Sequence, residues 1–595
     1  MRLPELYELK TSRNFIDAFG GYNHNPRIRE AEFYDMKNMT SSQYPILAPR
    51  GKRGVYASPE SPQGLISKDT LCYVDGTALV TDKYRVELGL STDEDMCPKT
   101  LVSMGAYVIV LPDKKYVNTS AILDAGSIEA EVTTKSPVTF TLCRLDGSDY
   151  SAGASPSEPS NPENMALWID TSSTPHTLKQ WSESSGMWIS VGTTYIKIEA
   201  SGIGVPFEKY DGVTISGLKN KTLYDNTTGE AIEDTSNLSQ LDGSFIIWEK
   251  GTDYIVVIGM LDITRTIRNS ITIKREMPDM DFIVESENRL WGCRYGFNNK
   301  GEMVNEIYAS KLGDFKNWNC FMGISTDSYV ASVGTDGVFT GAVTHLGYPI
   351  FFKEKYMHKV YGNFPSNYQV QTTACRGVQR GSEKSIAIVN EVLYYKSTLA
   401  VCAYDGSLPV EISSALGENL YYDAIGCSHG NKYYINMRNK ENVWHLFVYD
   451  AAKGMWHKED NIRVKDFCSS RDELYFIDAD TNVIKTMFGS GDSDEKAVEW
   501  MAESGVIGTS SPDKKYVSRI TVRMSLDIGA RVMFFAQYDS AGDFEPLCTM
   551  TGTSLRTFSV PIRPKRCDHF RLRIVGEGDC KIYSISKTIE EGSDI

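Results

Sequence analysis

The chain has 595 residues, of which 41% are hydrophobic and 23% charged, and its formal net charge is −15 at pH 7. This length exceeds what a single hydrophobic core holds, so we expect several domains. The acidic balance argues against a general nucleic-acid binder, which needs a basic surface to neutralise phosphates. It is compatible with a surface past which DNA slides without adhering.

The first ten residues lack the apolar core of a signal peptide, and apolar residues nowhere run together for the ~18 positions of a membrane-spanning helix. We therefore expect synthesis in the cytoplasm and no membrane span. The 12 cysteines are scattered and none forms a CxxC pair. This spacing favours free, reduced thiols over zinc or redox sites.

Residues 1–60 predict an extended N-terminal arm. The segments Phe19–Asn23, Phe33–Met39 and Pro45–Arg50 place apolar residues between turn formers, without a sustained period of 2 or 3.6. A loose tail would expose many aromatic rings to water. We therefore expect the arm to lie over a neighbouring surface, a loose tail being the alternative.

A repeated strand-and-turn pattern dominates residues 391–480. Its strands start at Leu393, Tyr433 and Leu474, which are 40 and 41 residues apart, a period typical of β-propeller blades with four short strands. Equivalent strands start near Leu71, Val108, Leu290 and Ile350. The sequence thus predicts an all-β protein with a propeller of about seven blades, six or eight being alternatives. It predicts the propeller in two parts, residues 61–126 and 263–490.

Two further β-domains are predicted on either side of the second propeller part. Residues 127–262 interrupt the blade rhythm with a Ser/Pro linker at 151–162 and three short aromatic-rich segments, which indicates an inserted small β-domain. After a Gly/Ser linker, residues 491–595 alternate apolar and polar residues over at least five segments. This period of 2 predicts a C-terminal antiparallel β-sandwich.

No pattern in the sequence predicts catalysis. None of the eight histidines has a metal-ligand spacing, and neither a GxSxG elbow nor a P-loop is present. Asp478, Asp480 and Asn482 have the spacing of some calcium loops, but the following Gly and the distal Glu are missing, which favours a structural turn. We therefore expect no enzyme activity, no catalytic residue, no cofactor and no metal.

Two groups of residues are candidates for interaction. A basic cluster lies in the C-terminal domain, where it could dock an acidic partner or contact DNA; the alternative is the wet face of one sheet. Three tryptophans of the insert could bind a glycan; the alternative is that they are packed core residues. The two groups are Arg563, Lys565, Arg566, Arg571 and Arg573, and Trp168, Trp181 and Trp188.

The arm and the propeller carry a family resemblance. Phe19–Asn23, Phe33–Met39 and Pro45–Arg50 resemble the start of bacteriophage tail proteins, and Arg289–Trp291 followed by Ile307–Trp318 is similar to the nozzle, or tail tubular, proteins of short-tailed phages. The resemblance covers about two thirds of the chain and matches the C-terminal sandwich only loosely. The insert departs in size from the family pattern.

The resemblance implies a structural virion protein of the tail nozzle or hub. Members of this family form rings, commonly hexamers, below the portal and adaptor, with an axial channel that conducts DNA during ejection without binding it specifically. Contacts to other tail proteins are also implied. Two alternatives from other classes remain: a tail module that binds host-surface glycans, and an enzyme that cleaves polysaccharides.

Overall fold

The computed structural model describes residues 11–93, 98–233, 237–298, 300–489, 493, 495–509, 514–552 and 554–591. These residues form an all-β protein in which the helices are short 3₁₀ turns, so the predicted fold class is confirmed. None of the helices in the described part of the chain has the length and apolar content needed to cross a bilayer. Residues 1–10, on which the signal-peptide prediction rests, lie outside the described residues.

The chain divides into two compact units. The first consists of Met1–Leu101, Gly337–Lys359 and Thr372–Ile595, and the second of Val102–Asp336 and Val360–Gln371. The strand pairs are antiparallel almost throughout; within the named strands, one parallel pair joins β16 and β17. Each unit is described by itself below.

Seven four-stranded sheets carry the repeat that the sequence predicts. In six of them, four consecutive strands of the chain pair in order, as in a propeller blade, and in the seventh three consecutive strands pair in order and are joined by β5. The seven predicted strand starts all lie in the second strand of a separate sheet, which confirms the repeat; the closure of the seven sheets into one propeller stays a prediction. The strands are β6(Pro62–Lys68), β7(Thr70–Asp75), β8(Ala78–Val80), β9(Arg85–Glu87); β10(Thr100–Met104), β11(Tyr107–Leu111), β12(Lys115–Asn118), β13(Ala125–Ser127); β29(Phe282–Ser286), β30(Arg289–Phe297), β31(Met303–Ala309), β32(Tyr329–Ser332); β33(Gly341–His345), β34(Tyr348–Lys353), β35(Tyr356–Tyr361), β36(Gln369–Ala374); β37(Ala387–Val389), β38(Val392–Lys396), β39(Val401–Tyr404), β40(Val410–Glu411); β41(Tyr421–His429), β42(Lys432–Asn439), β43(Trp444–Asp450), β44(Met455–Lys458); and β45(Val464–Ser470), β46(Glu473–Asp478), β47(Ile484–Thr486), β5(Gly54–Ala57).

The last of these sheets takes its outer strand from the other end of the chain. β47 pairs antiparallel with β5 of the arm, with Lys485 opposite Val55. Within unit 1, β45 also packs against β41 and β6. The pairing of β5 therefore ties the start of the chain to the end of the repeat.

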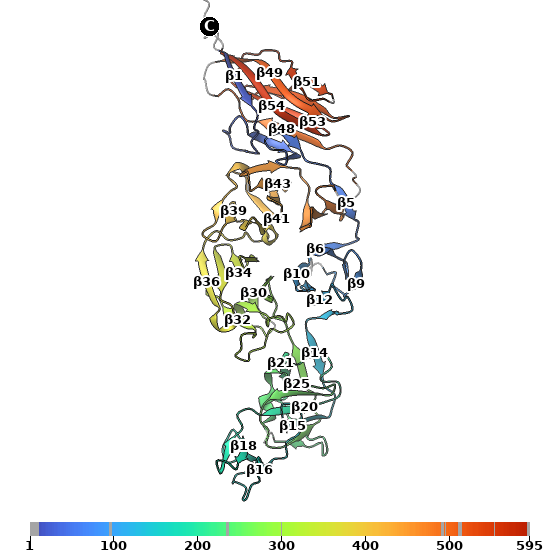
Figure 1. Cartoon of the computed structure of the whole chain (residues 1–595), viewed down its shortest axis with the longest axis vertical. Coiled ribbons are helices and arrows are strands. Elements are labelled where there is room, and N and C mark those ends of the chain that lie inside the picture. Colours follow the sequence, from blue (N-terminus) through green and yellow to red (C-terminus); the bar gives the residue numbers. More distant parts are fainter. Residues whose placement is uncertain are drawn as a thin grey trace, which may run out of the picture. The chain divides into compact units, whose positions relative to one another are not determined.

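The insert holds two sheets that share a core. A four-stranded sheet, β14-β28-β21-β24, packs against a five-stranded sheet, β25-β26-β20-β15-β27, around fully buried apolar side chains such as Phe140 and Ile198. A third sheet, β16-β17-β18-β19, lies at one end of the insert (Figure 1). The insert therefore extends past its predicted end at residue 262. Its strands are β14(Ala130–Thr133), β15(Val138–Cys143), β16(Gly153–Ser155), β17(Leu167–Asp170), β18(Thr177–Ser182), β19(Met187–Ser190), β20(Tyr195–Glu199), β21(Gly212–Ser216), β24(Gly243–Ile246), β25(Glu249–Lys250), β26(Tyr254–Ile258), β27(Arg265–Ile267) and β28(Thr272–Arg275), with a short hairpin of β22(Leu223–Tyr224) and β23(Ala231–Ile232).

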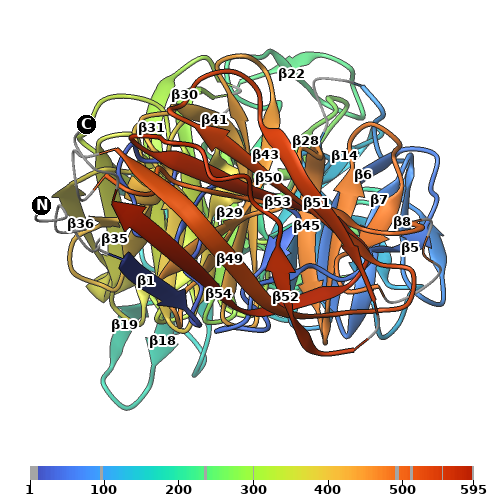
Figure 2. The same cartoon turned by 90° about the horizontal axis from the view of Figure 1, so that it is seen from above.

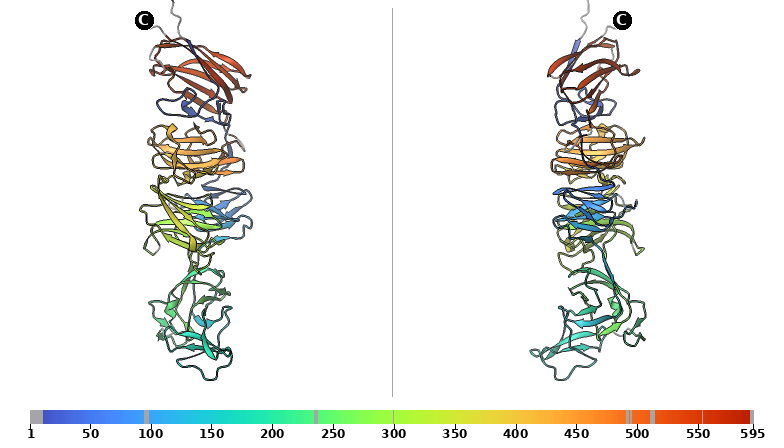
Figure 3. Two further views of the ribbon diagram at one scale, coloured as in Figure 1. Left: turned by 60° about the vertical axis from the view of Figure 1, so that its left-hand side comes forward. Right: turned by 90° about the vertical axis from the view of Figure 1, so that its right-hand side faces the viewer.

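The C-terminal domain has the two sheets of a sandwich, and the arm supplies one strand to each. β1 is an edge of the sheet β1-β54-β49-β52, and β2 is an edge of the sheet β2-β48-β53-β50-β51. Figure 2 shows β1 beside β54 and β49 in one layer, and Figure 3 shows the blue arm against the red sheets. The strands are β1(Thr11–Ile16), β2(Phe33–Lys37), β48(Glu499–Ser504), β49(Lys515–Leu526), β50(Arg531–Tyr538), β51(Glu545–Thr551), β52(Arg556–Val560), β53(Phe570–Glu577) and β54(Cys580–Glu591), and the arm also forms a ladder of β3(Met39–Thr40) and β4(Ala48–Pro49).

This pairing corrects the prediction that the arm is laid over a surface. Strands β1 and β2 belong to the chain's own sandwich, because their backbone N–H and C=O groups pair with those of β54 and β48. The segment Phe19–Asn23 needs glycine at position 21, because a Cβ there would lie 2.2 Å from the carbonyl oxygen of Trp456. Only glycine allows Tyr22 N–H to donate its 2.6 Å hydrogen bond to that oxygen, with Phe19 and Tyr22 buried.

An ion network lies where the arm meets the end of β44 and the linker before β48. Arg53 donates to Asp460 at 2.6 Å and to Glu459 at 2.8 Å, and Arg50 donates to Glu495 at 2.9 and 3.0 Å. Both arginines and Glu459 are buried. Burial raises the pKa of Glu459, because its charged form loses hydration. Removal of any one partner would therefore leave a buried charge without compensation and destabilise the fold.

Candidate functional site

The outer face of the five-stranded sheet of the sandwich holds the main candidate site. Along β53, Phe570, Leu572 and Ile574 are buried, whereas Arg571 and Arg573 lie on the opposite face with a period of 2. β50 pairs with β53 so that Phe535 lies opposite Arg573. The two strands therefore bring an aromatic ring and a guanidinium group side by side.

A buried carboxylate holds the two arginines. Glu503, on β48, lies opposite Arg573 and is 5% exposed. Arg573 donates to its Oε2 from Nε at 2.8 Å and from Nη2 at 2.6 Å, and Arg571 donates to Oε1 at 3.3 Å. Arg571 also lies over the ring of Tyr34, at 4.7 Å from its centroid. This geometry fixes both guanidinium groups before any ligand arrives.

The predicted basic cluster is therefore not one open positive patch. Arg571 and Arg573 share Glu503, and Lys565 pairs with Glu545 at 2.6 Å. Arg563 and Arg566 are exposed on the segment between β52 and β53. Glu503 and Glu545 pair with three of the five basic side chains and offset two of the five positive charges, so the cluster offers less attraction to an acidic partner or DNA than the sequence predicts.

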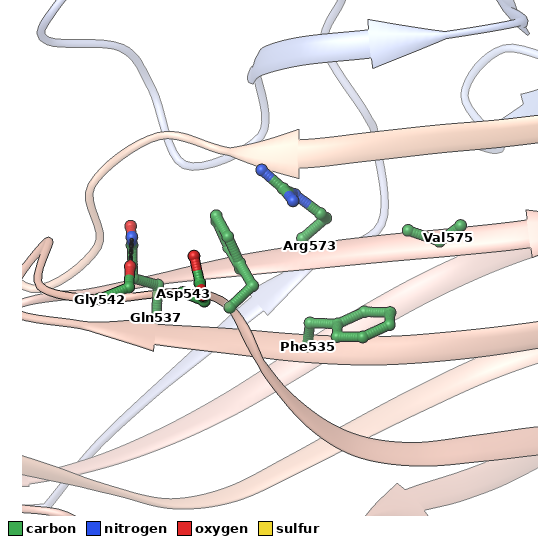
Figure 4. A pocket seen from close by; sticks show the side chains of 7 residues that line it. Phe535, Gln537, Gly542, Asp543, Arg573 and Val575 are labelled. Atoms are coloured by element: carbon green, nitrogen blue, oxygen red, sulfur yellow. Dashed lines mark hydrogen bonds between the residues drawn. The ribbon is translucent and has the colours of Figure 1, made fainter.

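A pocket opens on this face above β50 and β53. Its volume is about 440 Å³. Figure 4 shows that its side chains come from the two strands and from the turn between β50 and β51. The stack of Arg573 on Phe544, with 3.7 Å between guanidinium carbon and ring centroid, forms part of the wall. The lining residues are Phe535, Gln537, Gly542, Asp543, Phe544, Arg573 and Val575.

Among the residues that line this pocket, only Arg573 was predicted from the sequence as a site residue. The period-2 pattern of β50 places Phe535 and Gln537 on one face. What the sequence lacks is the register of β50 with β53, which brings them to Arg573. Glu503 carries no local signal, because its role depends on pairing with a strand some 70 residues away.

The three tryptophans of the insert lie together on the sheet β16-β17-β18-β19. Trp188 packs edge-to-face against Trp168 and Trp181, with centroid distances of 5.4 and 5.6 Å. Trp168 is 2% exposed and donates from Nε1 to the carbonyl oxygen of Ser155, so it is a core residue. Trp181 and Trp188 are half-buried. Only these two have surface available to a ligand.

Side chains around the tryptophans are apolar on one side and ionic on the other. Met187 and Ile189, on the edge strand β19, are 61% and 51% exposed. Lys179 lies 5.1 Å from the Trp168 ring centroid and bonds Asp170 at 2.7 Å. The Lys179 ammonium lowers the pKa of Asp170 to about 2.

Asp478, whose spacing resembles a calcium loop, lies in a hydrogen-bonded turn. Its Oδ1 accepts from the backbone N–H groups of Asp480 and Thr481 at 3.0 and 3.2 Å, and its Oδ2 pairs with Lys485 at 3.0 Å. Burial acts to raise the pKa of Asp478, but Lys485 and the two N–H groups outweigh it, and the pKa is lowered. In the described ranges, no group of His, Cys, Asp and Glu is arranged to hold a metal ion.

Comparisons with known proteins found no matching family model and no matching curated protein. Among solved structures, the chain is similar to an exo-beta-1,3-galactanase from Phanerochaete chrysosporium with galactose, at 8% identity over 51% of this chain and 94% of that chain, with a TM-score of 0.22. It is also similar to an engineered GH43 glycoside hydrolase with endo-xylanase and exo-arabinofuranosidase activity, at 8% identity over 52% and 98%, with a TM-score of 0.19.

Several of the solved structures that the chain matches are glycoside hydrolases, which are enzymes, so the prediction that the chain is not an enzyme is not upheld. At such TM-scores they assign no activity, substrate or catalytic residue to this chain.

Proposed function

We propose that this chain is a structural subunit of the tail nozzle or hub of a short-tailed bacteriophage, assembled as a six-membered ring around a DNA channel. The resemblance of the arm and the repeat to that family supports the proposal. The portal, the adaptor and other tail proteins are its neighbours, and the virion tail is its location after synthesis in the host cytoplasm.

The observation that carries this proposal is the role of the arm. The residues that bear the resemblance are buried where β37–β44 meet the sandwich: Phe19, Tyr22, Phe33, Met36 and Met39 share one core with Tyr433, Phe447, Trp456 and Trp500. β1, β2 and β5 fasten the same segment to three sheets. A subunit whose arm is buried and paired with three sheets is rigid, and the proposed tail ring needs rigid subunits.

The charge of the chain supports a conducting rather than a binding channel. At −15 per chain, a ring of six copies carries a large negative charge. Such a wall repels phosphates, so a duplex is not retained. Sequence-specific DNA contacts are not part of the proposal.

Negative-stain microscopy and light scattering of the purified chain test the ring, alone and with the portal and adaptor proteins. The expected particle is a ring of roughly 400 kDa, six times the 66.5 kDa chain. A particle that stays monomeric with all neighbours present refutes the proposal. Retention of duplex DNA at physiological salt contradicts the conducting channel.

A second candidate is a module that binds host-surface glycans, favoured by the half-buried Trp181 and Trp188. Aromatic faces of this kind stack on sugar rings. A glycan array probed with the wild-type chain and with Trp181→Ala tests it. Loss of binding on substitution supports this function, and equal binding refutes a role for Trp181.

A further inference from the structure

We propose that the pocket above β50 and β53 is a binding site for a neutral sugar unit of a glycan. This goes beyond the ring, because it gives the sandwich a ligand of its own. The site differs from the sheet β16-β17-β18-β19 of the insert, whose tryptophans are the glycan-binding residues predicted from the sequence. It rests on three properties of the pocket: its balance of charge, its mixture of groups and its preformed shape.

The charges in and beneath the pocket cancel. Two cations, Arg571 and Arg573, face two carboxylates, Glu503 below the pocket and Asp543 at its rim. A phosphate or carboxylate ligand would meet Asp543 as a like charge, and a cation would meet Arg573. A neutral polar ligand is repelled by neither Asp543 nor Arg573.

The groups that remain available suit hydroxyls and an apolar ring face together. In the described part of the chain, no residue accepts a hydrogen bond from Nη1 of Arg573, and none donates to the carboxylate of Asp543. Gln537 uses its amide N–H for Gly542, which leaves its oxygen as an acceptor. Phe535 adds an aromatic surface. A pyranose has hydroxyls that both donate and accept, and C–H faces that pack on such rings.

The walls are held in place without a ligand. Asp539 begins the turn between β50 and β51 and accepts from the N–H of Asp568 at 2.7 Å, while its own N–H donates to His569 O at 2.9 Å. Gln537 bonds Gly542 across the turn at 2.7 Å. A register shift after Phe534 in the β50–β51 pairing re-aims the side chains next to the pocket. Preorganisation of this kind lowers the entropic cost of binding.

The pocket volume, about 440 Å³, lies in the range of small-ligand sites. One or two sugar units fit such a volume, and the open side leaves room for the rest of a chain. The geometry therefore points to a terminal or internal sugar of a longer glycan, held with the weak affinity that a single unit provides.

Saturation-transfer NMR on the full chain tests the site with methyl glycosides of galactose, glucose, rhamnose and N-acetylglucosamine, at concentrations on the order of 10 mM because single units bind weakly. We expect saturation of ring C–H protons for at least one sugar, and a loss of roughly tenfold or more in affinity for Asp543→Ala and for Phe544→Ala. Ile528→Ala, on a 92% exposed side chain of the same domain, is the matched control and keeps the wild-type signal. Inorganic phosphate is expected not to displace the bound sugar, so the saturation signal should stay unchanged when it is added.

Three results overturn the proposal: no signal from any sugar, signals that Asp543→Ala and Phe544→Ala leave unchanged, or signals lost in Trp181→Ala instead, which would move the site to the insert. Asp543 is exposed, so its substitution leaves folding intact and a lost signal reports on the pocket. Ring formation of Asp543→Ala, seen by microscopy, separates this test from the proposed function, since either can fail alone.

Discussion

Glu495 is predicted to stabilise the attachment of the arm in a pH-dependent way. Burial opposes its ionisation, but two hydrogen bonds from Arg50 and one from the backbone N–H of Arg53 lower its pKa from 4.5 to about 2. That difference corresponds to about 3 kcal/mol at neutral pH. Glu495→Gln is expected to cost about 2 kcal/mol, since the amide oxygen still accepts a hydrogen bond.

The sign of the pH effect follows from the lowered pKa. A carboxylate whose folded pKa is depressed stabilises the fold above its unfolded pKa, and this contribution is lost as pH falls from about 4.5 toward 2. Scanning calorimetry of wild type and Glu495→Gln from pH 7 to pH 3 should show a midpoint gap of roughly 4–8 °C at pH 7. The contribution of Glu495 falls by about 2 kcal/mol between pH 7 and pH 3, so nearly all of this gap should be gone at pH 3.

The matched control for this prediction is Glu499→Gln. Glu499 lies in the same stretch of chain and pairs with Lys37 at 3.2 Å, but it is 73% exposed. Exposed pairs contribute about 0–1 kcal/mol, so its gap should be small at every pH. A Glu495→Gln gap no larger than that of Glu499→Gln, or one that does not narrow toward pH 3, would show that the buried network does not hold the arm.

Two further predictions concern the same unit. Gly576→Ala places a Cβ 2.2 Å from the Trp500 ring in the sandwich core and should cost about 1–3 kcal/mol in chemical denaturation. Gly51→Ala, whose Cβ would meet nothing within 4 Å, should change stability little, and equal effects would refute the packing. His457 is buried, which lowers its pKa to about 3, so stability should fall as pH drops from about 6.5 toward 3, by up to about 1.4 kcal/mol per pH unit. His457→Gln should flatten that part of the calorimetric pH profile, and an unchanged slope would contradict the neutral histidine.

The repeat could be predicted from the sequence because six of its seven sheets are formed by strands that follow one another along the chain. In the sheet β41–β44, every strand pairs with the next along the chain, so Tyr433 marks the blade without knowledge of distant residues. The sandwich was also predictable as a pattern, since β53 alternates strictly between buried and half-buried positions, and β49 alternates in the same way apart from one shift at Ser518 and Arg519. Local pairing and a period of 2 leave a direct trace in the sequence.

The arm could not be predicted in the same way because its partners are distant. Thr11 pairs with Glu590, and Val55 pairs with Lys485, so no local window contains both sides of either ladder. The pocket is hidden for the same reason: Phe535 and Arg573 become neighbours only through the register of β50 with β53. The end of the insert was misplaced because β28 has a strand pattern like that of a blade, and only its pairing with β14 and β21 assigns it to the insert.

The arm changes what an assembly of this chain can use for its contacts. From the sequence, Phe19, Tyr22 and Met36 are candidates for contact with a partner, but in the structure they are buried in the chain's own core. In the proposed ring, contacts between subunits or with other tail proteins must therefore come from surfaces that the fold leaves open. Two such surfaces differ in their chemistry: the apolar edge strand β19, with Met187 and Ile189 exposed, and the polar pocket above β53. An exposed apolar edge strand favours protein association, and a charge-balanced pocket favours a small neutral ligand. The two surfaces should therefore respond to different substitutions.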